Sequence, residues 1–141
     1  MSKKIPRPIE QEFPLDRWDP DDKVVIRQAT QAAHERRSML FAEVTRVYRD
    51  AAAAGVQEIK QSISPQEVRR IEVQLTLQAC TLRDEDDKSL FRFRTTETGR
   101  QVLDMTEAEF AEAWGRLPPE VAAEIHEKVI AINPMWGPGG E

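Results

Sequence analysis

The chain has 141 residues, enough for one ordinary domain and too few for two of typical size. Its formal net charge of -5 argues against a general nucleic-acid binder, because contacts to phosphate need an excess of Lys and Arg. The single cysteine, Cys80, excludes an internal disulfide and favours a reducing cytosol. No apolar stretch approaches the roughly 20 residues that span a bilayer, so we expect no association with a membrane. The negative net charge likewise leads us to expect no nucleic-acid partner.

The first 22 residues carry four of the nine prolines. Because proline removes a backbone donor and fixes φ, we expect residues 1–22 to form an extended arm. Apolar side chains interrupt this segment at intervals, the largest being Trp18. Such an arm either lies across its own domain or reaches a neighbouring subunit.

One strand and a long helix are expected next. The β-branched run at residues 23–27 is short and flanked by turn residues, which predicts a strand. Thr30 is placed to cap a helix with an apolar stripe that includes Leu40 and Val44. Gly55 predicts the end of this helix, since glycine adopts the left-handed conformation at low cost.

A second helix start is predicted at Ser64-Pro65-Gln66-Glu67. Ser64 can accept from the third helical amide, and Pro65 occupies the first position, where no donor is needed. Further on, residues 73–80 fit both a helical stripe and the alternation of a strand. The start signal and the length favour helix, and the strand stays open as the alternative.

Residues 84–87, Asp-Glu-Asp-Asp, interrupt the apolar periodicity and predict a solvated turn, either between two short β segments or within a plain loop. A calcium loop of the EF-hand type needs glycine at its sixth position and glutamate at its twelfth. Counted from Asp84, these positions hold Ser89 and Thr95, so the calcium pattern fails.

The clearest helix start lies near the C-terminal end. Thr106 and Glu109 form a capping box, and Met105 and Phe110 are spaced as a hydrophobic staple around it. Pro118-Pro119 ends this helix and begins a last one, which Asn133-Pro134 stops. We expect a helical hairpin with a two-proline corner.

The elements together predict a mainly α fold with one or two short β segments. We expect one small, mostly helical domain over residues 23–136, preceded by the extended Pro-rich arm and followed by a flexible Gly/Pro tail at residues 137–141.

Residues able to support catalysis do not form a recognisable pattern. His34 and His126 each lack a second histidine four residues away, and Cys80 lacks a CxxC partner. We therefore expect no enzymatic activity, no cofactor and no bound metal.

Several motifs follow one another along the chain: Val24-Val25-Ile26-Arg27, Val68-Arg69-Arg70, Leu75-Thr76-Leu77-Gln78-Ala79-Cys80, Asp84-Glu85-Asp86, Leu90-Phe91, Met105-Thr106-Glu107-Ala108-Glu109-Phe110 and Asn133-Pro134. This order resembles that of the tail assembly chaperones of long-tailed bacteriophages, which are made just upstream of the tape measure protein. The resemblance spans roughly residues 23–136. Members of the family often carry glycine where this chain has Asp87.

The resemblance implies a small, largely helical, non-enzymatic protein of the host cytoplasm. Such a protein coats the tape measure protein until tail tube subunits replace it, which implies self-association and a contact with the tail tube protein. A structural virion component (a tail-completion or connector subunit) and a small helical regulator that binds a host protein are the alternatives.

Apolar side chains near the ends of elements are the candidate contacts for a helical partner. Trp114 is expected to favour the core, and Trp136, beside Gly137-Pro138, is the better candidate for an exposed contact. The full set of candidate partner-binding residues is Trp18, Phe110, Trp114, Met135 and Trp136.

Overall fold

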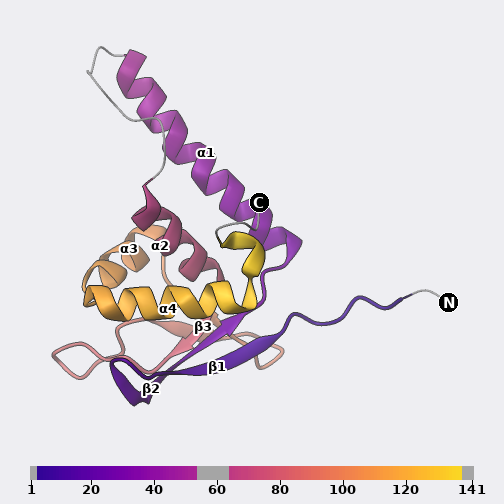
Figure 1. The fold of residues 1–141 in the computed structure, drawn as a ribbon, viewed down its shortest axis with the longest axis vertical. Helices are drawn as coiled ribbons and strands as arrows, with labels where there is room; N and C mark the ends of the chain where they lie inside the picture. Colours follow the sequence, from indigo (N-terminus) through magenta and orange to yellow (C-terminus); the bar gives the residue numbers. More distant parts are fainter. Residues whose placement is uncertain (1–2, 54–63, 138–141) are drawn as a thin grey trace.

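The computed structural model describes residues 3–53 and 64–137, with the backbone alone for residues 43–53. In these ranges the fold mixes helices with two antiparallel sheets, so the expectation of a mainly α domain is wrong (Figure 1). The strands are β1 (Glu10–Leu15), β2 (Asp19–Arg27), β3 (Leu77–Cys80), β4 (Phe93–Thr95) and β5 (Gln101–Leu103). The helices are α1 (Gln31–Ala53), α2 (Pro65–Thr76), α3 (Glu107–Gly115) and α4 (Pro119–Ile132), followed by the 3-10 helix η1 (Pro134–Trp136).

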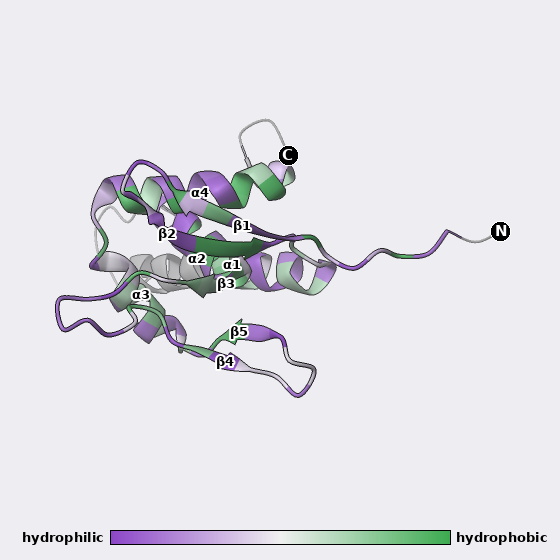
Figure 2. Cartoon of the chain, turned by 90° about the horizontal axis from the view of Figure 1, so that it is seen from below, coloured by the Kyte–Doolittle hydropathy of each residue, from purple (hydrophilic) through white to green (hydrophobic). Residues whose placement is uncertain are grey.

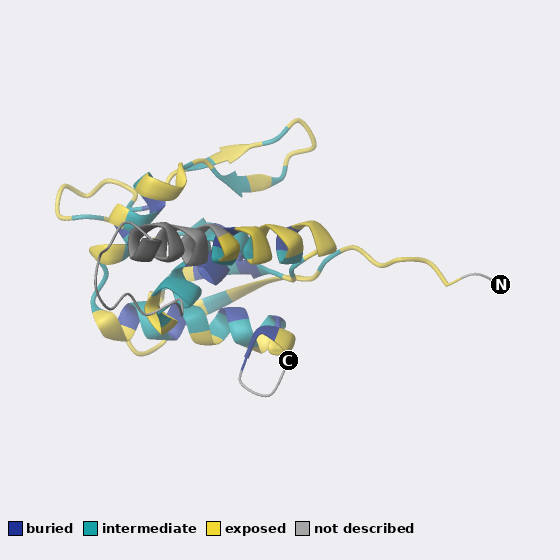
Figure 3. Cartoon of the chain, turned by 90° about the horizontal axis from the view of Figure 1, so that it is seen from above, coloured by how far each residue is buried: buried dark blue, intermediate teal, exposed yellow. Residues whose placement is uncertain are grey.

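The expected N-terminal arm is largely a β-hairpin. β1 pairs antiparallel with β2, with Phe13 opposite Val24, so residues 10–22 are corrected from a separate arm to part of a sheet. Pro14 is tolerated because the strand order is β1-β2-β3, which leaves β1 at the edge. Of the described arm residues, those from 3 to 9 lie outside regular structure, and Figure 3 shows them as mostly exposed.

The core lies between the three-stranded sheet and the helices. Val24 and Ile26 alternate along β2 and are fully buried on the face that meets α4. Val121, Ile125 and Val129 recur along α4 at helical spacing and are also buried. Figure 2 shows the hydrophobic residues of the sheet lying against this helix.

The segment at residues 73–80 contains both of the predicted patterns in succession. Helix α2 continues to Thr76, whose hydroxyl donates to the carbonyl of Glu72 at 2.7 Å. From Leu77 the chain becomes β3, because the free edge of β2 offers ladder hydrogen bonds to it. The register shifts by one residue between Ala79 and Leu77, which makes Gln78 a β-bulge.

The predicted acidic turn is confirmed, with an isolated bridge between Arg83 and Ser89 on its two sides. Asp84 accepts from the backbone N–H groups of Asp86 and Lys88, which holds the turn together. Asp87 has a φ of 60°, a conformation that glycine adopts more readily than other residues. β5 has no counterpart among the sequence expectations.

The two helices predicted around the proline corner form as α3 and α4, but both pack on α2 rather than on each other, so the expected hairpin of two packed helices is wrong. The hydroxyl of Thr106 accepts from the Glu109 N–H at 3.1 Å, and the Glu109 carboxylate accepts from the Thr106 N–H at 2.9 Å. The Thr106 N–H, with Arg92, lowers the pKa of Glu109. The ionised carboxylate therefore stabilises the helix cap at pH values above the usual titration range of glutamate. This stabilisation is lost as the pH falls through the lowered pKa of Glu109.

Three buried polar side chains connect α4 and its neighbours. The carboxylate of Glu72, on α2, accepts from His126 at 2.8 Å and from Arg37 of α1 at 2.9 Å. Glu124 accepts from the Arg17 N–H at 3.2 Å. Asn133 accepts from the Ala29 N–H at 2.7 Å, just before α1. Hydrogen bonding lets these groups be buried at an acceptable cost.

Two substitutions at the start of α3 separate the contribution of the cap from that of the core. Thr106→Ala removes one capping bond and should lower the free energy of unfolding by about 1 kcal/mol. Phe110→Ala empties a fully buried site beside Phe91 and should cost about 3–5 kcal/mol. Urea unfolding measures both losses, and equal losses would contradict the burial of Phe110.

Candidate functional site

The structure disperses the five candidate partner-binding residues. Trp18 and Met135 are exposed, at 50% and 64% of their surface. Phe110 is fully buried, and Trp114 packs on it with ring centroids 6.1 Å apart. These two aromatic residues therefore belong to the core or its border.

Trp136 is buried, so the expectation of an exposed contact at this position is wrong. The 3-10 helix η1 folds back after Asn133 and brings the indole against α1. There its Nε1–H donates to Nδ1 of His34 at 3.3 Å, and the Arg37 guanidinium lies 5.3 Å from the ring centroid. The indole can be buried here because its N–H has a hydrogen-bond acceptor and its ring has a cation–π partner.

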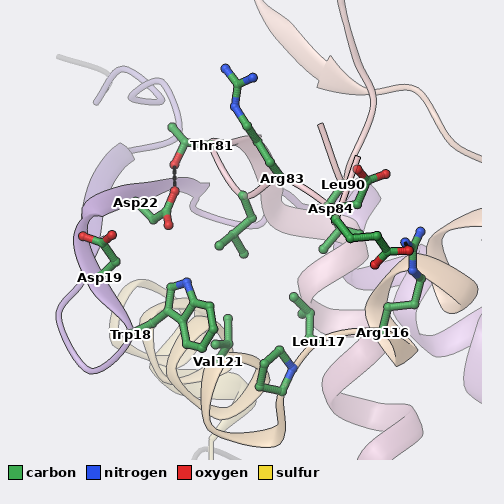
Figure 4. A pocket seen from close by; sticks show the side chains of 13 residues that line it. Trp18, Asp19, Asp22, Thr81, Arg83, Asp84, Leu90, Arg116, Leu117 and Val121 are labelled. Carbon is green, nitrogen blue, oxygen red and sulfur yellow. Dashed lines mark hydrogen bonds and ion pairs between the residues drawn. The ribbon is translucent and has the colours of Figure 1, made fainter. Parts of the chain in front are cut away.

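A cleft of about 490 Å³ surrounds Trp18. Three segments far apart in the sequence meet there, as Figure 4 shows: the start of the β2 strand, the chain that follows β3, and the corner between α3 and α4. The turn before β2 is closed by the Trp18 N–H, which donates to the Leu15 carbonyl at 3.0 Å.

One wall of the cleft is apolar. Val121 lies at the start of α4 and is buried, and Leu117 and Pro118 precede it at the proline corner. Figure 4 shows the indole of Trp18 beside Val121, and Leu82 and Leu90 also line the cleft. An apolar side chain of a partner would be removed from water when it packs against this wall, and this burial would stabilise the complex.

The remaining wall carries a net negative charge. Arg116 is already paired with Glu85 at 3.3 Å. Asp22 accepts from the hydroxyl of Thr81 at 2.8 Å. The charged residues lining the cleft are Asp19, Asp22, Asp84 and Glu85 against Arg83 and Arg116.

One of these carboxylates, Asp84, is held in its charged form by hydrogen bonds. Hydrogen bonding from the backbone N–H of Lys88 is the main cause that lowers the pKa of Asp84, with help from Arg116. A cleft with an apolar wall and a carboxylate rim favours a partner that combines apolar with basic side chains.

Cys80 lies at the edge of another surface hollow, beside Ala79 and Phe93. Burial raises the pKa of its thiol to about 12, so the nucleophilic thiolate is scarce near neutral pH. Within the described residues no three or more His, Cys, Asp or Glu side chains are grouped to hold a metal ion. None of the described helices is long and apolar enough to cross a membrane.

Comparison with known proteins found no matching family model, no matching curated protein and no matching solved structure.

Trp18 and the proline corner both stand out in the sequence, but nothing in the sequence indicates that they line the same cleft. Local patterns predict a helix end at Pro118 and an exposed tryptophan near the N-terminus. The cleft arises because Glu124 of α4 holds the Arg17 N–H, a contact between residues 107 positions apart. No local signal encodes such a pairing.

Substitution of Trp18 tests whether its side chain belongs to a surface or to the core. Trp18→Ala should lower the free energy of unfolding by less than about 1 kcal/mol, because half of the side chain is already exposed. Leu82→Ala, in the wall of the same cleft, should cost about 2–5 kcal/mol because Leu82 is buried. Equal losses in denaturant would make Trp18 a core residue.

Proposed function

We propose that this protein is a non-enzymatic tail assembly chaperone of a long-tailed bacteriophage. It binds an amphipathic helical segment of the tape measure protein in the cleft at Trp18, and it keeps that protein soluble in the host cytoplasm until the tail tube assembles.

The single observation that carries the proposal is the half-exposed Trp18 beside an apolar wall. Exposing half of a tryptophan to water forgoes much of the free energy that its burial would supply. A partner side chain laid against Trp18, Leu117 and Val121 would recover it. Tryptophan is also among the residues that most often dominate the energy of an interface.

The charges around the cleft support a helical partner with basic residues. An amphipathic helix binds in a groove through apolar residues spaced three or four apart. Lys or Arg residues beside that stripe would meet Asp19 and Asp22 at the rim. Contacts of this kind are individually weak and reversible, which suits a chaperone that must later leave its client.

The sequence resemblance supports a role in phage tail assembly through the order of the motifs and not through the amount of helix. The family is expected to be largely helical, and the strands of this chain depart from that expectation. The motif order includes the acidic turn, whose positive φ at Asp87 suits the glycine that members often carry.

Co-expression with the candidate tape measure protein tests the proposal. We expect the soluble fraction of the tape measure protein to rise severalfold when this protein is present. Trp18→Ala should remove most of that gain, whereas Met39→Ala should preserve it, because Met39 is an exposed apolar residue on α1 outside the cleft.

Two outcomes would contradict the proposal. The first is a tape measure protein equally insoluble with and without this protein. The second is recovery of this protein in purified phage particles by mass spectrometry, since a chaperone leaves before the particle is complete. That second outcome would favour a structural virion component.

A further inference from the structure

A second hollow, separate from the cleft at Trp18, lies on the outer side of the three-stranded sheet. It encloses about 850 Å³ between the N-terminal segment at Arg7 and Pro8, the outward-facing Val25 and Ala79, and the loop that joins β4 to β5. Figure 2 shows this loop and the N-terminal segment on the same side of the molecule. We call this hollow the trough.

The trough contains a buried donor that lacks an acceptor. Gln78 is only 5% exposed, and its Nε2 has no hydrogen-bond partner in the described part of the chain. The β-bulge places Gln78 out of the alternation of β3, so that its side chain lines the trough. Bulges often redirect a side chain toward a functional site, and a buried orphan donor calls for an explanation.

Cationic groups flank this donor. Arg100 and Arg7 both line the trough, against the single carboxylate of Glu10. The Arg100 Nε is buried without a hydrogen bond among the described residues, and its distance of 3.7 Å from Glu10 makes only an ion pair. The trough therefore has an excess of positive charge and unused donors, which is the opposite of the acidic cleft.

An unused acceptor lies next to the trough. Gln78 also lines an adjoining cavity of about 180 Å³, together with Gln74 and apolar residues of β5. The Oε1 of Gln74 is buried and has no partner in the described ranges. A peptide group offers both an acceptor for Gln78 and a donor for Gln74, whereas a simple anion offers acceptors alone.

We propose that the trough binds an extended, acidic peptide segment of a partner protein. Carboxylates of the segment pair with Arg7 and Arg100, and a carbonyl of the segment accepts from the Gln78 side chain. In an extended peptide alternate side chains share one face, so glutamates at alternate positions can face the arginines together. The intervening side chains then meet the apolar surface of Val25 and Ala79.

A labelled peptide of alternating Glu and Val, acetylated and amidated at its ends, is the probe. Its binding to the intact protein is followed by fluorescence anisotropy, beside a matched peptide with Gln in place of Glu and beside free succinate as competitor. We expect saturable binding of the acidic peptide that weakens with added salt, at least tenfold weaker binding of the Gln peptide, and little competition by succinate.

Substitutions distinguish a binding role of the trough from a structural one. Gln78→Leu removes the orphan donor, so it should weaken peptide binding at least tenfold without lowering the midpoint of urea unfolding. Arg100→Gln should weaken binding by a similar factor. Arg94→Gln is the matched control on the same hairpin, since Arg94 does not line the trough, and its affinity should stay within twofold of wild type.

Three results would overturn the proposal: no binding of the acidic peptide at millimolar concentration, equal binding of the acidic and Gln peptides, or unchanged affinity in Gln78→Leu and Arg100→Gln. Complete displacement by succinate would replace the peptide site with an anion site. The outcome is independent of the proposed chaperone function, because Trp18→Ala should leave peptide binding unchanged.

Discussion

The buried carboxylate of Glu72 is the interaction on which the arrangement of the helices depends. Glu72 sits on α2 with 1% of its surface exposed, and it bonds to Arg37 of α1 and to His126 of α4. A carboxylate accepts only, so Nε2 of His126 carries the proton that is shared. Removing such a carboxylate from water costs several kcal/mol, which good partners must offset. The three helices therefore have one packing that satisfies this group.

The position of α4 then sets the geometry of the cleft. Val121, at the start of this helix, forms the apolar wall, and Glu124 one turn later fixes the turn that presents Trp18. Asn133, at the opposite end, binds the backbone between β2 and α1. Because buried polar groups join α1, α2 and α4, the fold can keep an exposed tryptophan in place without burying it in the core. The proposed client contact thus depends on interactions well inside the fold.

Helices whose ends are marked by capping residues could be predicted from the sequence. Elements that depend on contacts between residues far apart in the sequence were missed. The caps at Ser64 and Thr106 formed as expected, because the capping bonds join residues three apart. The hairpin of β1 and β2 was missed because prolines indicated an extended arm, whereas an edge strand tolerates Pro14.

Trp136 was expected to be exposed because it stands beside Gly137. It is instead buried against Arg37 and His34, which lie about 100 positions away in the sequence. The predicted end of the first long helix at Gly55 lies outside the described residues, as do residues 138–141 of the predicted tail. Gly137, the first residue of that tail, is instead buried, and its N–H donates to the Pro134 carbonyl.

A double-mutant cycle between Arg37 and Glu72 tests the central role of this carboxylate most directly. The control is the pair Arg17 and Glu127, which is shorter at 2.7 Å but exposed at the surface. Urea unfolding of the single and double alanine variants should give a coupling of about 2 kcal/mol or more for the buried pair and less than about 1 kcal/mol for the exposed pair. Glu72→Ala alone should cost about 3–5 kcal/mol, because it leaves Arg37 without its partner. Equal coupling energies for the two pairs would contradict a packing of the helices organised by Glu72.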